Sequence, residues 1–240
     1  MAGPRRTEAA FPRIRPAGDQ GLLVELGEGV DEEVHARVLA FDAALRAEPF
    51  AGFTESVPAY ASVLVGYDPL VAELGSVRAR VEALLARPAA DAGAGRLHEV
   101  AVCYEAGFAP DLASVAERCG LMAEEVVAAH LAGDYRVFMY GFAPGYAYLG
   151  GVPAAIRLPR KPNPVRGVAA GSVLVAGAQC LVTTVAAPTG WWVIGRSPTR
   201  ILRAEAERPF LFEVGDRVRF RRIGAAEFKR HASPAAVKAP

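Results

Sequence analysis

The chain has 240 residues, of which 52% are hydrophobic, and a formal net charge of +1. This length fits one or two domains with a sizeable core, and the near-neutral charge gives no electrostatic case for nucleic acid binding. No apolar run reaches the roughly 18 residues that span a membrane, and the N-terminus lacks the apolar core of a secretory signal.

The chain has three widely spaced cysteines, Cys103, Cys119 and Cys180. They form no disulfide framework, and each is expected to be a packed core residue rather than a nucleophile. A reduced, cytoplasmic protein is the simplest interpretation.

Residues 87–96 are small and glycine-rich, and they show no apolar periodicity. Such a composition is typical of a linker. It divides the chain into a predicted front domain, residues 1–92, and a predicted back domain, residues 93–240.

The front part is expected to alternate strands and helices. Strands are predicted at 20–26, 53–59 and 61–67, and helices at 31–47 and 70–85. Asp31 can cap the first helix, and apolar residues recur on one face from Val34 to Leu45. His35 lies among charged neighbours and is expected to be exposed. The order of elements predicts a two-layer α+β sandwich.

The back part is expected to be rich in short strands. Strands are predicted at 97–104, 135–140, 172–176, 180–186, 191–195 and 217–223, and helices at 110–119 and 123–131. Gly133 is placed to end the second helix. Many short strands with glycine and proline turns favour a β-sandwich or a closed barrel. The basic run RVRFRR at 217–222 is interpreted as a solvated strand face, and residues 232–240 as a loose tail.

Familiar catalytic motifs are missing from the sequence. There is no GxxxxGK[ST] phosphate loop, no GxSxG elbow and no HExxH. The four histidines, His35, His98, His130 and His231, lack metal-ligand spacing, so no metal site is predicted. His130 ends a predicted helix, where the dipole favours a cation, and its structural interpretation is preferred. An enzymatic site would be unusual or shared with a partner.

Four segments between residues 102 and 198 carry uncommon combinations of glycine, proline and tryptophan. They are VCYEAGFAPDLASVA, YRVFMYGFAPGYAYLGG, LPRKPNPVRGVAAGSVLVAG and APTGWWVIGRSP. In this order they resemble motifs of the allophanate hydrolase subunit 1 family, which is also described as the Kip-inhibitor, 5-oxoprolinase subunit or carboxyltransferase domain family. The chain departs from the family pattern at Ala109, Ala169 and Thr189.

The resemblance implies a cyclophilin-like β-barrel in the back part and a small α+β front domain. It also implies a homologous barrel subunit as partner, together with a further lactam-utilisation subunit. In an ATP-dependent 5-oxoprolinase, such a complex opens the lactam of 5-oxoproline to glutamate, and ATP can be bound on a partner. One alternative is the carboxyltransferase half of a biotin-dependent urea carboxylase. Another, of a different class, is a regulator that binds a histidine kinase.

Five side chains are predicted to bind substrate: Tyr146, Arg160, Ser172, Gln179 and Arg196. Tyr146 can present a hydroxyl, and the forks of Arg160 and Arg196 suit a carboxylate. Backbone amides at Ser172 can hold an oxyanion, and Gln179 matches the donor and acceptor of a lactam. Each has a structural alternative. Tyr146 can fill a barrel corner, Arg160 can serve surface solubility, and Arg196 can hold a neighbouring acidic residue. Ser172 can belong to a plain turn, and Gln179 can make a turn-side hydrogen bond.

Four further residues are predicted to form the pocket wall or a subunit interface: Phe142, Pro144, Tyr148 and Trp191. Trp191 and Trp192 are adjacent on a predicted strand and therefore face opposite sides, so one of them is expected in the core. Lys161 and Arg166 share the proline-stiffened loop of Arg160 and are further candidates for an anion. No general base is predicted.

Overall fold

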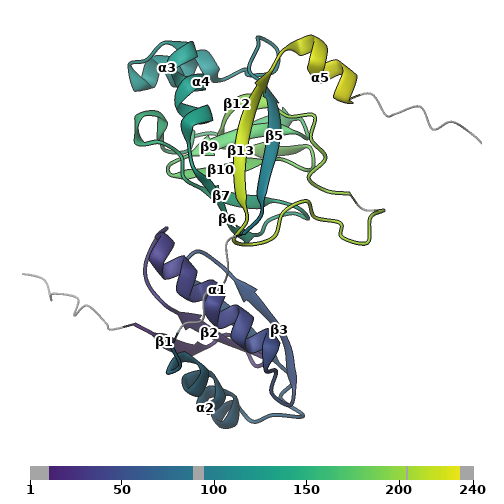
Figure 1. Ribbon diagram of the computed structural model, residues 1–240. Helices are drawn as coiled ribbons and strands as arrows, with labels where there is room; N and C mark the ends of the chain where they lie inside the picture. Colours follow the sequence, from purple (N-terminus) through teal and green to yellow (C-terminus); the bar gives the residue numbers. More distant parts are fainter. Residues whose placement is uncertain (1–10, 89–94, 204, 233–240) are drawn as a thin grey trace, which may run out of the picture. The chain divides into compact units, whose positions relative to one another are not determined.

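The computed structural model describes residues 11–88, 95–203 and 205–232. The chain divides into two compact units, Met1–Gly93 and Ala94–Pro240 (Figure 1). The predicted boundary after residue 92 falls within residues 89–94, which lie outside the described part. Among the described residues, no helix is both long and apolar enough to cross a bilayer.

The first unit is a sheet with helices on one face (Figure 1). Its elements are β1 (Arg13–Pro16), β2 (Gly21–Glu25), α1 (Glu32–Ala47), β3 (Phe53–Pro58), β4 (Ser62–Tyr67) and α2 (Leu74–Leu85). The strands pair antiparallel in the order β1-β2-β4-β3. Apolar residues of β2, β4 and both helices form one buried cluster. The predicted two-layer α+β sandwich is confirmed.

Helix α1 begins as predicted, and its predicted apolar face is buried, with Val34 packed against the same cluster. The Asp31 carboxylate caps it by accepting from the Val34 amide at 2.8 Å. His35 is fully buried, as are Val38 and Leu45. The predicted exposure of His35 is wrong, because it precedes Val38 by three positions and therefore shares its face.

Helix α2 begins one turn later than predicted, at Leu74 rather than at residue 70. The Asp68 carboxylate accepts from the Leu70 amide at 2.9 Å, and its carbonyl accepts from the Val71 amide at 3.1 Å. These bonds make a turn around Pro69. Leu70, predicted to belong to the apolar helix, is 94% exposed.

The second unit is a closed barrel flanked by short helices (Figure 1). Its strands are β5 (Leu97–Cys103), β6 (Tyr135–Tyr140), β7 (Ala147–Gly150), β8 (Val165–Val168), β9 (Ser172–Ala176), β10 (Gln179–Val182), β11 (Ala187–Thr189), β12 (Trp192–Arg196) and β13 (Arg217–Ile223). Its helices are α3 (Leu112–Cys119), α4 (Ala123–Ala132), η1 (Ala154–Ile156) and α5 (Ala225–Ala232).

The barrel closes in the order β10-β7-β6-β13-β5-β12-β9, and β8 and β11 pair in a separate small sheet. The pair β13–β5 is parallel. The closed strand order confirms the predicted barrel. The strand predicted at 180–186 ends earlier, at Val182. Just beyond this end, the Thr183 hydroxyl donates to the Ala169 carbonyl at 2.9 Å.

The basic strand β13 confirms the predicted solvated face. Val218 and Phe220 are buried in the barrel core. The outward residues Arg217 and Arg221 pair with carboxylates at 2.8 Å. Arg222 donates to Glu124 of α4 at 2.6 Å. The charges therefore serve surface ion pairs, which contribute at most about 1 kcal/mol each. Of the predicted tail, residues 233–240 lie outside the described part.

Candidate functional site

A pocket of about 140 Å³ lies on the outer side of the barrel wall. Side chains alternate along a strand, so Val173 and Val175 of β9 belong to the interior core, whereas Leu174 faces the pocket. The lining consists of Phe142, Tyr146, Tyr148, Arg160, Leu174, Leu181, Thr183, Ala187, Pro188, Thr189, Gly190 and Trp191. Five of the nine predicted site or interface residues meet there.

One wall of the pocket is the loop between β6 and β7. Phe142 has a left-handed backbone, with φ 70°, and its side chain is 77% exposed. Such a backbone is costly for an aromatic residue and marks a feature held by its surroundings. The Phe142 ring lies 5.4 Å from that of Tyr146. Gly145 has φ 75°, and a Cβ there would come within 3.0 Å of the Thr184 methyl, so the turn requires glycine.

Two tyrosines, Tyr146 and Tyr148, line the pocket. Burial raises the pKa of Tyr146, and the neighbouring Tyr148 adds to this rise. Burial also raises the pKa of Tyr148, against the opposing charge of Arg160. Both phenols therefore stay protonated at neutral pH. The Tyr148 ring lies 5.9 Å from that of Trp191, edge to face.

Arg160 supplies the positive charge of the pocket. Its guanidinium carbon lies 5.5 Å from the centroid of the Trp191 ring, within the range of a cation–π contact. Arg160 is exposed, so its donors can reach a ligand. Its neighbour Lys161 points elsewhere and pairs with Asp111 at 2.5 Å, so Lys161 is not an anion ligand in this pocket.

The structure does not bring Ser172 into this pocket. Ser172 is 4% exposed, and its hydroxyl donates to the Ala169 carbonyl at 2.8 Å. Its amide donates to the Thr183 hydroxyl at 2.9 Å, and the Gly171 amide donates to the Thr183 carbonyl at 2.7 Å. The predicted oxyanion donors are already used within the chain and lie outside this lining.

The other predicted residues also lie outside the lining. Gln179 begins β10 and pairs with Ala176 across the hairpin. Arg196 donates to the Ala170 carbonyl at 3.2 Å and lies 5.8 Å over the Phe228 ring. Pro144 is exposed, and its carbonyl accepts from the Thr184 hydroxyl at 2.6 Å.

Several lining residues were not predicted. In the predicted strand, Leu181 and Thr183 alternate with Cys180 and Val182. The period of two therefore puts Leu181 and Thr183 together on one face, which is the outer face of the barrel. In the sequence, Thr189 stands out only as a departure from the family pattern. Its hydroxyl accepts from the Trp191 amide at 3.1 Å and shapes the turn beneath Trp191.

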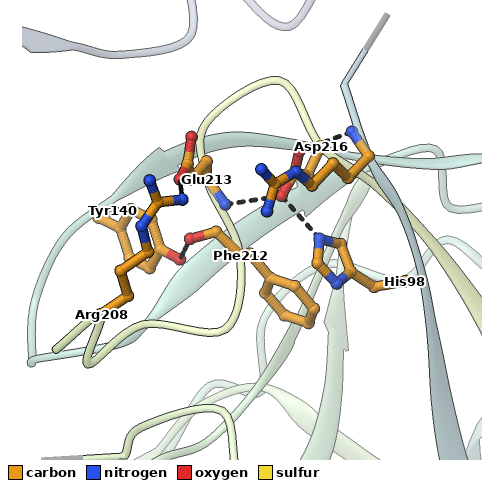
Figure 2. A network of polar contacts seen from close by, with 7 residues as sticks. His98, Tyr140, Arg208, Phe212, Glu213 and Asp216 are labelled. Atoms are coloured by element: carbon orange, nitrogen blue, oxygen red, sulfur yellow. Dashed lines mark hydrogen bonds and ion pairs between the residues drawn. The ribbon is translucent and has the colours of Figure 1, made fainter. Parts of the chain in front are cut away.

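A second polar cluster centres on Asp216, which is 5% exposed (Figure 2). Its carboxylate bonds His98 Nε2 at 2.7 Å and accepts from the Arg96 and Glu213 amides, both at 2.8 Å. The Tyr140 hydroxyl donates to the Phe212 carbonyl at 2.7 Å (Figure 2). These bonds join the starts of β5 and β13 to the loop before β13. The carboxylate is satisfied, and its role is structural.

A third cluster surrounds His130, which is fully buried. Its Nδ1 lies 2.8 Å from the Tyr104 hydroxyl, and its Nε2 lies 3.6 Å from Cys180 Sγ. Burial lowers the pKa of His130 to about 3 and raises that of the Cys180 thiol. His130 is therefore neutral rather than the cation favoured by a helix end. Among the described residues, no group of His, Cys, Asp and Glu is arranged to hold a metal.

The family described as "Carboxyltransferase domain, subdomain C and D" matches residues 12–212. The chain belongs to this family. It is 37% identical to a 5-oxoprolinase subunit of Bacillus subtilis (strain 168), over 90% of this chain and 95% of that protein. The predicted family membership is thus confirmed.

Solved structures agree with the carboxyltransferase-domain fold. The crystal structure of TTHA0988 matches with a TM-score of 0.77 and 37% identity. The match covers 89% of this chain but only 40% of that longer chain. The Kluyveromyces lactis urea carboxylase matches with a TM-score of 0.75 and 17% identity, over 96% of this chain and 23% of that one. The latter likeness concerns the fold alone.

Proposed function

We propose that this chain is one component of an ATP-dependent 5-oxoprolinase, which opens the lactam of 5-oxoproline to glutamate together with a homologous barrel subunit. The observation that carries the proposal is the pocket, where the Arg160 guanidinium lies over Trp191 in a lining that also contains Tyr146 and Tyr148. The name of the Bacillus subtilis relative supports the same activity.

The pocket suits a small, planar, anionic amide. A lactam ring can lie against the Trp191 face, its carboxylate can pair with the fork of Arg160, and its carbonyl can accept from a tyrosine hydroxyl. The pocket volume is about 140 Å³. It is below the roughly 300 Å³ at which ordinary ligand pockets begin.

The same volume argues against a nucleotide in this pocket, so the proposal places the ATP site on a partner subunit. ATP would activate the amide oxygen, because amide resonance otherwise makes the lactam resist water. The residues of this chain would bind and orient the substrate. A hydroxyl donor aimed at the carbonyl oxygen would stabilise the charge that develops there.

The described lining contains no carboxylate, histidine, cysteine or lysine. A general base for the attacking water must therefore come from outside this lining, which supports a site shared with the barrel partner. The need for a general base from outside this lining is also the reason why the proposal includes a further lactam-utilisation subunit.

A second candidate is the carboxyltransferase half of a biotin-dependent enzyme. The description of the matching family favours it. In that case the small amide would accept a carboxyl group from biotin instead of being opened.

The test is a pull-down with this chain as bait, followed by assays of the recovered complex. We expect a homologous barrel subunit, and glutamate release from 5-oxoproline that requires ATP. Carboxyl transfer from biotin without lactam opening would favour the second candidate. Recovery of a histidine kinase alone, with no turnover, would contradict both and indicate a regulatory protein.

A further inference from the structure

Two adjacent cations lie on two adjacent indole rings that face opposite sides of the barrel wall. The Arg160 guanidinium carbon is 5.5 Å from the Trp191 ring centroid, and Lys161 Nζ is 5.2 Å from that of Trp192. Trp191 lines the pocket, whereas Trp192 belongs to the barrel core. The loop is therefore held on the core side while it presents Arg160 on the pocket side.

The backbone on each side of Arg160 is bonded to β12 or to the turn before it. The Trp192 indole donates to the Pro159 carbonyl at 2.8 Å. The Lys161 amide donates to the Gly190 carbonyl at 2.7 Å. With both neighbours tied, the Arg160 backbone cannot shift along the strand without breaking one of these bonds.

Asp111 connects this loop to the start of α3. It occupies the N-cap position, yet its side chain makes no cap bond to its own helix. Its Oδ2 instead accepts from Lys161 Nζ at 2.5 Å and from the Val193 amide at 2.7 Å. The Lys161 side chain is 9% exposed. Removing one partner of such a pair leaves the other charge poorly solvated.

We propose that the Asp111–Lys161 ion pair positions Arg160 over Trp191 and thereby sets the affinity of the pocket for an anionic ligand. Neither Asp111 nor Lys161 lines the pocket, so both act through Arg160. A held loop loses less conformational entropy when Arg160 engages a ligand. The inference rests on the proposed function only in the choice of 5-oxoproline as probe.

The first test needs no ligand. In the full chain labelled with ¹⁵N, the Arg160 Nε–Hε cross-peak, assigned with Arg160→Gln, should show a high heteronuclear NOE. Lys161→Met should lower this NOE. The matched control is Arg118→Met, because Arg118 is an exposed cation 5.1 Å from the same Trp192 ring with no part in the ion pair. An unchanged NOE in Lys161→Met would overturn the inference.

Lys161→Met leaves the Asp111 charge behind and can impair folding. The double variant Asp111→Asn/Lys161→Met removes both charges and avoids this difficulty. It should also lower the Arg160 NOE, and the inference fails if the NOE in the double variant equals that of the original chain.

The second test compares 5-oxoproline with 2-pyrrolidinone, which has the same ring without the carboxylate. In the complex with the barrel partner, Lys161→Met should weaken 5-oxoproline binding by about three- to tenfold. Binding of 2-pyrrolidinone should not change, and Lys161→Arg should restore most of the loss. Equal losses for both ligands would mean a generally loosened pocket and would overturn the inference.

The variant Arg160→Gln distinguishes the proposed carboxylate recognition from the positioning role of the ion pair. If it leaves 5-oxoproline affinity unchanged, the proposed carboxylate recognition is wrong, and the NOE measurement alone decides the positioning. If Arg160→Gln weakens 5-oxoproline binding and Lys161→Met does not, the proposed function stands and the positioning role is wrong.

Discussion

The pocket beside Trp191 and the cluster around His130 lie on opposite sides of one barrel wall and differ in what their polar groups contact. In the cluster, His130 meets Tyr104 and Cys180, and all three are almost or fully buried. In the pocket, Arg160 is exposed, and Tyr146 and Tyr148 line a cavity of about 140 Å³.

The comparison shows that residue type alone does not identify a site. Histidine, cysteine and tyrosine are the side chains of acid–base and nucleophilic chemistry, yet here burial makes them inert: it lowers the pKa of His130 to about 3 and raises those of Cys180 and Tyr104. The described pocket lining contains neither histidine nor cysteine, but the donors of its exposed Arg160 can reach a ligand. Access to a ligand is therefore the better guide.

The largest expected effect tests the pocket side of this comparison. Arg160→Gln should lower the affinity for 5-oxoproline by about ten- to a hundredfold, because a charge-assisted pair with the carboxylate is lost. The KM and kcat of the reconstituted complex measure it, with thermal unfolding as the fold control. Arg166→Gln is the matched control, an exposed arginine of β8 outside the lining. Equal losses in both variants would assign the effect to general surface charge.

Acid should destabilise the fold through the buried cluster. The folded pKa of His130, about 3, lies below the unfolded value of about 6.5. Between these values only the unfolded chain binds the proton, so stability falls as the pH falls. From pH 7 to pH 5 the loss should be about 2 kcal/mol. Urea unfolding measures it, and His130→Gln should show a smaller loss. An identical pH dependence in His130→Gln would contradict this assignment.

Tyr104→Phe should cost about 1–2 kcal/mol of unfolding free energy, because it leaves His130 Nδ1 buried without its 2.8 Å partner. Ligand affinity should stay unchanged, since Tyr104 does not line the pocket. Urea denaturation and a binding titration on the same variant measure both quantities. A loss of affinity without a loss of stability would reverse the roles assigned to the two regions.

Much of the fold could be predicted from the spacing of apolar residues and from the order of the motifs. The helical spacing of α1 and the alternating residues of β13 were visible in the sequence, and so was Gly133 at the end of α4. The short strands β7, β8 and β11 were not, because three or four residues acquire strand geometry only from their partners. The expected exposure of His35 is wrong because its charged neighbours hide its place beside Val38 on the buried face.

The candidate site was only half visible for a similar reason. Tyr146, Tyr148 and Trp191 follow from their motifs, but their meeting with Arg160 depends on the path of a proline-rich loop. The ion pair that holds this loop, Asp111 with Lys161, joins residues 50 positions apart. No local pattern contains such a contact. For Ser172, the motif was present, but the hairpin uses its donors internally.

The variant with the smallest expected effect on stability, Tyr146→Phe, distinguishes the pocket most sharply from the cluster around His130. The Tyr146 hydroxyl donates to the Val185 carbonyl at 3.4 Å, which is long for a hydrogen bond between oxygens. Tyr146→Phe should therefore change the unfolding free energy by less than about 0.5 kcal/mol, while the KM for 5-oxoproline rises a few-fold. This is the reverse of Tyr104→Phe, although both variants remove one phenol oxygen. If Tyr146→Phe instead lost as much stability as Tyr104→Phe, with no change in KM, its hydroxyl would be a structural group, and Tyr148 would be the remaining hydroxyl donor for the lactam.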